Sequence, residues 1–90
     1  MLGISITAPG VAYGHHGQCS GWNGCGDAAT CAQWACQAEG YSTLVSFGED
    51  RPCTQWGVCH LFNNGCCGGV DYNWGNWCDV RGVSEILCAP

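Results

Sequence analysis

The segment YNWGNWC, residues 72–78, gathers aromatic rings in a pattern typical of carbohydrate recognition. In an extended chain Tyr72 and Trp74 share one face, and Trp77 follows after a flexible glycine. Flat rings of this kind stack on sugar rings. The side chains nearby that can bond sugar hydroxyls are Asn73, Asn76, Asp71 and Asp79. The sequence therefore predicts a carbohydrate-binding face, although the same surface could dock a neighbouring copy, because Trp and Tyr are enriched at interfaces.

Three other tryptophans stand beside cysteines in a repeated Cys-x-x-Trp spacing, in CSGWNGC, CAQWAC and CTQWGVC. Large rings near disulfides commonly fill the interior of small scaffolds. We expect Trp34 and Trp56 to pack in the core. Trp22 lies in a glycine-rich loop and is kept as a candidate binding residue as well as a packing residue.

The histidines offer little metal chemistry. His15 and His16 are adjacent between glycines and look like a metal-binding arm, but one pair gives at most two ligands. We expect a solvated loop there and no metal or other cofactor. His60 shares a predicted strand face with Trp56 and Phe62 and is expected to be a packed core group.

A calcium loop is also a poor fit. The segment from Asp71 begins like an EF-hand, but its fifth, sixth and twelfth positions hold Gly75, Asn76 and Gly82. A different calcium site would have to use Asp71, Asn73 and Asp79. Catalysis has no support either, because the chain has no nucleophile elbow, and bridging every cysteine leaves no thiol nucleophile. We expect a protein that is not an enzyme.

Ten cysteines in 90 residues are the strongest signal of fold class. Their number is even and no Cys-x-x-Cys pair occurs, which favours disulfides over zinc. The predicted disulfide cysteines are Cys19, Cys25, Cys31, Cys36, Cys53, Cys59, Cys66, Cys67, Cys78 and Cys88. Disulfides persist in oxidising compartments, so we expect a secreted, extracellular protein. Vicinal Cys66 and Cys67 are expected to serve two separate bridges.

The charges exclude several partners. The chain has seven acidic residues, two arginines and no lysine, which gives a formal net charge of −5. Nucleic-acid binding needs clustered Lys and Arg, and so does binding to anionic membranes. No apolar run approaches the length of a membrane span. Only nine of the 90 residues are charged, and a surface so poor in charge is either closely packed on something or made of neutral polar groups and glycine.

The chain reads as a single domain over 1–90, with an N-terminal strand and Pro-Gly hinge at 1–10 and a cysteine-framed core at 19–88. The first ten residues lack the basic start and apolar run of an export signal, so we expect a removed leader or a longer precursor.

One helix is predicted at about 27–39. Asp27 is a suitable N-cap, residues 28–39 are strong helix formers, and Gly40 stands where a left-handed C-terminal residue would end it. Cys31 and Cys36 are separated by a helical rise of about 7.5 Å, too far for a mutual bridge. Both must therefore bond other parts of the chain.

The remaining pattern is of short strands. Residues 2–8, 41–47, 56–62, 70–74 and 83–89 alternate with period two, whereas YGHHGQ is predicted as loop and GEDRP as turn. The predicted fold is a small disulfide-rich α+β domain, with one helix cross-linked to a short antiparallel sheet of four or five strands.

Two stretches resemble C-type-lectin-like domains, ATCAQWACQAEGYSTLVSF and the closing CDVRGVSEILCA. The resemblance implies a disulfide between Cys36 and Cys88. It covers about a third of the chain, and the Glu-Pro-Asn and Trp-Asn-Asp motifs of that family are missing.

Three functions remain open. The leading one is a non-catalytic extracellular module that associates with copies of itself or with other extracellular proteins, as a subunit of a coat, matrix or fibre. Its strand 2–8 could complete a neighbour's sheet. The second is a carbohydrate-binding module using the aromatic face. The third is a secreted signal, inhibitor or toxin whose scaffold displays one variable loop, such as GEDRP at 48–52.

Overall fold

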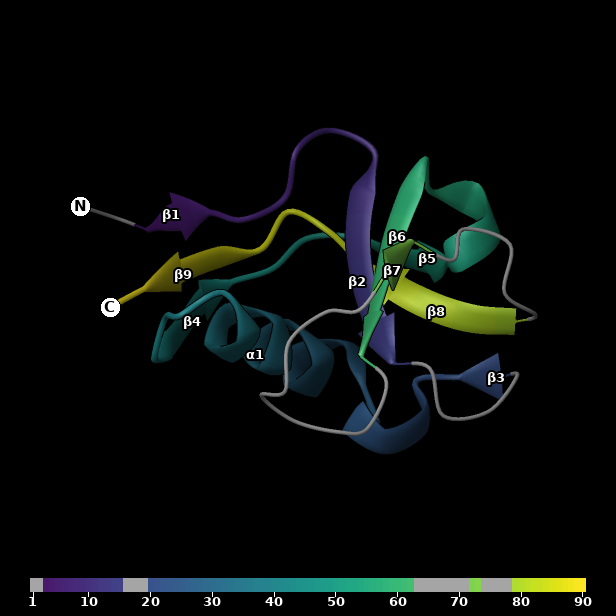
Figure 1. The fold of residues 1–90 in the computed structure, drawn as a ribbon, viewed down its shortest axis with the longest axis horizontal. Coiled ribbons are helices and arrows are strands. Elements are labelled where there is room, and N and C mark those ends of the chain that lie inside the picture. Colours follow the sequence, from purple (N-terminus) through teal and green to yellow (C-terminus); the bar gives the residue numbers. More distant parts are fainter. Residues whose placement is uncertain (1–2, 16–19, 63–71, 74–78) are drawn as a thin grey trace.

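A single helix packs against two β-sheets in the computed structural model, which describes residues 3–15, 20–62, 72–73 and 79–90 (Figure 1). The described part contains nine strands and two short 3-10 turns, Asn23–Cys25 and Cys53–Gln55. The predicted α+β class is therefore confirmed. The predicted single antiparallel sheet of four or five strands is wrong, because there are two sheets and one of them is mixed.

Helix α1 spans Ala28–Ala38, as the sequence predicts. The Asp27 carboxylate accepts a hydrogen bond from the Thr30 backbone N–H at 2.8 Å, and this bond lowers the pKa of the Asp27 carboxyl. At the other end Gly40 has φ +94°, and the Gly40 and Tyr41 N–H groups donate to the carbonyls of Gln37 and Cys36. Glycine ends the helix here because this backbone conformation strains residues with a Cβ.

The smaller sheet is antiparallel and has the order β1-β9-β4. Its strands are β1 (Ile4–Ser5), β9 (Leu87–Ala89) and β4 (Thr43–Ser46). Ile4 lies opposite Cys88 in this sheet, so the N-terminal strand pairs with its own chain. It is shorter than the predicted strand 2–8, and it is an outer strand of this sheet.

The larger sheet is mixed. Its main path runs β3 (Ser20–Gly21), β8 (Asp79–Val83), β2 (Val11–His15), β6 (Val58–Phe62) and β7 (Tyr72–Asn73), with β5 (Asp50–Pro52) also paired to β8. The longest ladder, between β2 and β6, is parallel, and so is the short one between β3 and β8. These parallel pairings join segments far apart in the chain.

Strand β2 corrects the predicted loop YGHHGQ, since Tyr13, Gly14 and His15 form a buried strand between β8 and β6. The glycine that appeared to mark a turn serves a close approach instead. Gly14 lies opposite Gly82 on β8, and a Cβ at Gly14 would collide with the Arg81 carbonyl oxygen.

The predicted turn GEDRP is also partly wrong, because Asp50–Pro52 pairs with β8. The Arg81 guanidinium donates to the Asp50 carboxylate at 2.6 Å and to the Asp50 backbone carbonyl oxygen at 3.3 Å. These bonds hold β5 against β8. The segment therefore does not form a free display loop.

The predicted strand 83–89 is interrupted. β8 ends at Val83 and β9 begins at Leu87, because Glu85 takes a left-handed backbone conformation with φ +57°. Ser84 and Ile86 on either side of it are buried, while Glu85 is exposed.

Three disulfides join the described cysteines: Cys25–Cys31, Cys36–Cys88 and Cys53–Cys59. The prediction that helix cysteines 31 and 36 bond elsewhere is confirmed, and so is the pairing of Cys36 with Cys88 that the lectin-like resemblance implied. The predicted bridges of Cys19, Cys66, Cys67 and Cys78 lie outside the described residues.

Two apolar cores lie on opposite sides of the larger sheet, since adjacent strand residues such as Leu61 and Phe62 belong to different clusters. Trp22 and Trp34 pack against the core that α1 covers, and Trp56 packs against the other. Packing of Trp34 and Trp56 is thus confirmed. The predicted shared face of Trp56 and Phe62 is wrong, because β6 begins only at Val58.

We expect Gly82→Ala to lower the free energy of unfolding by about 1–3 kcal/mol, as overpacking does. A Cβ at residue 82 would lie 2.7 Å from Cys59 Sγ and 3.0 Å from Ala12 Cβ. The Cys53–Cys59 disulfide is fully buried, so it has no room to move away from this Cβ. The matched control is Gly57→Ala, whose Cβ would meet only the Gly10 carbonyl oxygen at 3.5 Å. Denaturant unfolding of the unreduced proteins checks this, and equal losses in both variants would contradict it.

Candidate functional site: a pocket between the two sheets

The predicted carbohydrate face lies mostly outside the described residues, which do not include Asp71, Trp74, Asn76 or Trp77. Tyr72 and Asn73 are described through their backbone alone. They form β7, the end strand of the larger sheet's main path, with Asn73 opposite His60 on β6. The aromatic face therefore stays a prediction.

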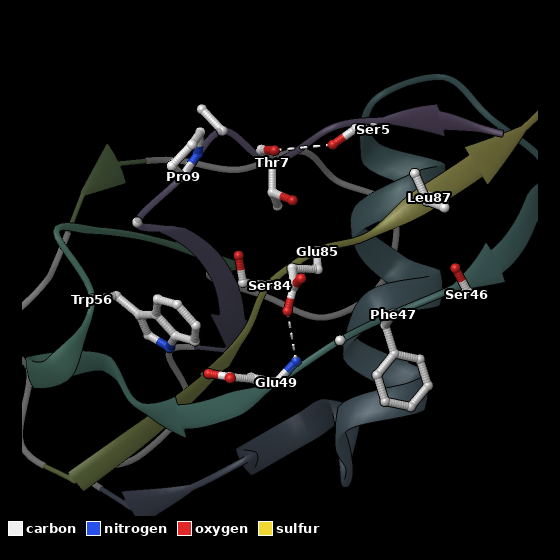
Figure 2. Close-up of a pocket in the computed structure, with 13 residues that line it drawn as sticks. Ser5, Thr7, Pro9, Ser46, Phe47, Glu49, Trp56, Ser84, Glu85 and Leu87 are labelled. Carbon is white, nitrogen blue, oxygen red and sulfur yellow. Dashed lines mark hydrogen bonds between the residues drawn. The ribbon is translucent and has the colours of Figure 1, made fainter.

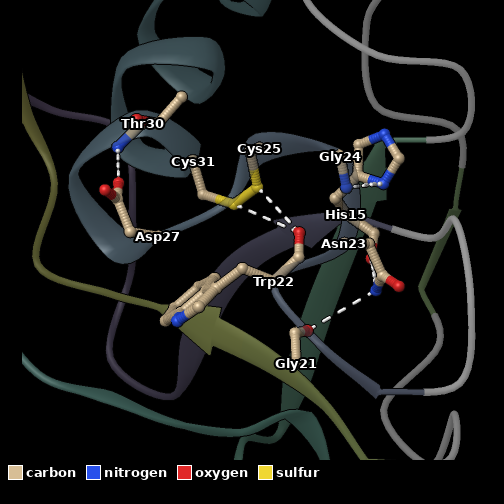
Figure 3. The surroundings of a disulfide bond; sticks show 9 residues. All are labelled: His15, Gly21, Trp22, Asn23, Gly24, Cys25, Asp27, Thr30 and Cys31. Carbon is tan, nitrogen blue, oxygen red and sulfur yellow. Dashed lines mark hydrogen bonds between the residues drawn. A yellow bond between two sulfur atoms is a disulfide. The ribbon is translucent and has the colours of Figure 1, made fainter.

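Trp22 is half-buried beside the Cys25–Cys31 bridge (Figure 3). Its carbonyl oxygen lies 3.2 Å from Cys25 Sγ and 4.0 Å from Cys31 Sγ. Its ring packs against the core beneath α1, which is the packing role that the sequence left open.

His15 corrects the expectation of a solvated loop, because only 6% of its surface is exposed. Its Nδ1 accepts the Gly24 N–H at 3.2 Å (Figure 3). Its ring meets that of Trp34 edge-on, with the ring centres 5.6 Å apart. Its carbonyl accepts the Asn23 side-chain amide at 2.7 Å. His16 lies outside the described residues, among which no three His, Cys, Asp or Glu side chains cluster as a metal site.

Tyr13 links β2 to the end of the helix. Its hydroxyl donates to the Glu39 carboxylate at 3.0 Å, and its ring lies 5.2 Å from that of half-buried His60. Burial raises the pKa of the Tyr13 hydroxyl far above its ordinary value, and the negative charge of Glu39 raises it further. Tyr13 therefore stays neutral and works as a hydrogen-bond donor.

This pKa predicts a loss of stability at alkaline pH. The contribution of neutral Tyr13 is fully present below the unfolded tyrosine pKa of about 10 and is lost as the pH rises toward the higher folded value. Tyr13→Phe should flatten the dependence of the unfolding free energy on pH above about 10. It should also leave the tyrosinate absorbance of the folded protein at about pH 11 unchanged, because Tyr13 is still neutral at that pH and does not contribute to it. Glu39→Gln should lower the pKa of Tyr13. A Tyr13 that ionises in the ordinary range would contradict the assignment.

A pocket with a volume of about 660 Å³ opens between the two sheets (Figure 2). This volume lies within the roughly 300–1,000 Å³ usual for ligand sites. Its walls come from the link between β1 and β2, the end of β4 and the link from β4 to β5, the segment before β6, and the break between β8 and β9. The lining side chains used below are Thr7, Ser46, Phe47, Glu49, Trp56 and Glu85.

Trp56 forms one end of this pocket, and Phe47 lies at the other (Figure 2). The Trp56 Nε1–H donates to the carbonyl oxygens of Gly82 at 3.1 Å and Arg51 at 3.3 Å, which fixes the ring. The Arg51 guanidinium lies 5.0 Å from the centre of the Trp56 ring and forms an ion pair with Glu49. One indole thus serves both the second core and the pocket wall.

Glu85 and Glu49 line the pocket between Trp56 and the end of β4, and the Phe47 ring points away from Glu85 (Figure 2). The Glu85 Oε1 accepts the Glu49 backbone N–H at 3.4 Å. The Glu85 side chain runs over Gly48, where an added Cβ would lie 2.6 Å from Glu85 Cβ. The absence of a side chain at residue 48 therefore makes room for this carboxylate.

Sequence reasoning missed this pocket. It treated Trp56 as core only and residues 48–52 as a turn. The lining segments lie far apart in the chain, and no spacing rule brings them together. The available signal was a single acidic residue inside the apolar run VSEILCA.

Comparison with protein-family models, with curated proteins and with solved structures found no match. The likeness to C-type-lectin-like domains therefore stays a resemblance in two stretches. No described helix has the length and apolar character needed to cross a bilayer.

Proposed function

We propose that this chain is a non-catalytic extracellular module that works by association, as a self-associating subunit or repeat of a coat, matrix or fibre. Three disulfides among the described residues fit an oxidising, extracellular setting. The shortage of charge fits a surface that comes close to other copies of itself.

The observation that carries this proposal is an exposed apolar pair on the smaller sheet. Val45 is 45% exposed and Phe47 is 40% exposed, and they are the large hydrophobic side chains most open to solvent in the described part of the chain. Val45 lies in β4, an outer strand, and Phe47 is the first residue after this strand. A neighbouring copy that covered them would remove apolar surface from water.

Contact through the face of β4 is favoured over contact through its edge. The Gln33 side-chain amide accepts the Leu44 N–H at 3.2 Å and donates to the Ser42 carbonyl at 3.3 Å. These are the two groups that a parallel partner strand would bond. Gln33 therefore blocks strand addition at this point, as edge-protecting side chains do in other sheets.

We expect the double variant Val45→Thr and Phe47→Ser to weaken self-association by about tenfold or more, because covering one such side chain is worth about 1.5–3 kcal/mol. Ala29→Ser, at an exposed position of α1, is the control and should leave association unchanged. Sedimentation velocity over a range of concentrations measures the effect. A wild-type protein that stays monomeric at every concentration would contradict the proposal.

Carbohydrate binding by the 72–77 segment is the second candidate. It is favoured by the position of β7 as an end strand, paired with β6 on one side among the described residues. A glycan array tests it, since Trp74→Ala and Trp77→Ala should abolish any sugar binding detected. Binding that survives both substitutions would exclude this face.

A further inference from the structure

We propose that the pocket between the two sheets binds an organic cation, an ammonium or guanidinium group such as the end of a lysine or arginine side chain of a partner protein. This binding site is additional to the apolar contact proposed above, although Phe47 belongs to both surfaces. Four features support it: the charge of the pocket, the Trp56 ring in its wall, the way that Glu85 is placed, and the hydroxyl groups of the wall.

The pocket carries negative charge that the described residues do not fully neutralise. Glu49 and Glu85 line it, and no positively charged side chain is among its described lining residues. Arg51, outside the lining, pairs with Glu49. The described partner of the Glu85 carboxylate is the backbone N–H of Glu49, which leaves its charge uncompensated. With a formal net charge of −5, the whole chain also attracts cations and repels anions.

The Trp56 ring in the pocket wall suits an organic cation better than a metal ion. Cations are attracted to the faces of indole and phenyl rings, and desolvation strengthens this attraction. The chain already shows this chemistry, because the Arg51 guanidinium lies over Trp56 while it pairs with Glu49. A metal ion would need more oxygen ligands than two carboxylates, and no cluster of three metal-binding side chains occurs among the described residues.

The placement of Glu85 is costly for folding. The left-handed backbone conformation of Glu85 is unfavourable for a residue with a side chain. The position of the Glu85 side chain also requires a glycine at residue 48, because a Cβ there would collide with it. The exposed carboxylate makes one long backbone hydrogen bond, which is weak compensation. A strained residue that directs a charged group into a pocket is typical of a binding site.

The Ser84 hydroxyl of the wall is left as an acceptor. It donates its hydrogen to the Val11 carbonyl oxygen, whereas Thr7 Oγ1 accepts the Ile86 N–H at 3.1 Å and keeps its own O–H as a donor. The Ser46 hydroxyl has no partner among the described residues. A donor-rich group such as guanidinium fits this arrangement, with a carboxylate to accept charge-assisted bonds.

The test is an NMR titration of the unreduced, isotope-labelled protein with agmatine and with n-butylammonium. We expect dissociation constants on the order of millimolar, with shifts at residues 5–10, 46–49, 56 and 84–87, weakening as salt is added. Glu85→Gln should weaken binding by about tenfold or more, because a hydrogen bond to a charged group is worth about 1.5–3 kcal/mol. Asp79→Asn makes the same charge change at the exposed first residue of β8, outside the pocket lining, and should have little effect.

Arg51→Gln should change the affinity for cations in the opposite direction to Glu85→Gln. It frees the Glu49 carboxylate, so we expect cations to bind several-fold more tightly. Glu85→Gly keeps the test open if Glu85→Gln folds poorly, since glycine tolerates the left-handed conformation and should fold while losing affinity.

Four results would overturn the proposal. The first is that methyl glucoside shifts the pocket resonances while agmatine and n-butylammonium do not, which would make the pocket a saccharide site. The second is that neither agmatine nor n-butylammonium causes any shift. The third is an equal loss of affinity in Glu85→Gln and Asp79→Asn, and the fourth is weaker cation binding in Arg51→Gln. The titrations are run at a protein concentration at which sedimentation velocity shows the monomer, so that a second copy covering Phe47 does not enter the result and failure of self-association leaves this test intact.

Discussion

The bridge between Cys36 and Cys88 is the constraint on which the arrangement of the smaller sheet depends. It joins α1 to β9, the middle strand between β1 and β4, across a sequence separation of 52 residues. Closing a loop of that length removes about 4 kcal/mol of chain entropy from the unfolded state, against about 2 kcal/mol for a six-residue loop. Both cysteines are fully buried, so the bridge also fills the core beneath the helix.

The larger sheet depends on a second constraint, the close approach of β2 and β8 at Gly14 and Gly82. Side chains at these positions would separate the strands or displace the Cys53–Cys59 bridge. The two sheets meet where β8 ends at Val83 and the chain turns through Glu85 into β9. The pocket lies at this junction, so its shape follows from the same backbone break that separates the sheets.

Local signals in the sequence predicted the helix well. The capping Asp27 and the terminal Gly40 mark its ends, and the five-residue separation of Cys31 and Cys36 correctly excluded a bridge between them. Strand β2 and the pocket could not be predicted in this way. The parallel partner of β2 is some 47 residues away, Val11 lying opposite Val58, and a glycine between strands reads like a glycine in a turn.

The most direct test of this account is disulfide mapping of the unreduced protein by mass spectrometry after digestion at acidic pH, where thiol–disulfide exchange is suppressed because thiolates are scarce. We expect a peptide pair that joins Cys36 to Cys88, together with the local pairs Cys25–Cys31 and Cys53–Cys59. A free thiol at either end of the long bridge, or Cys36 joined to any other cysteine, would contradict the account.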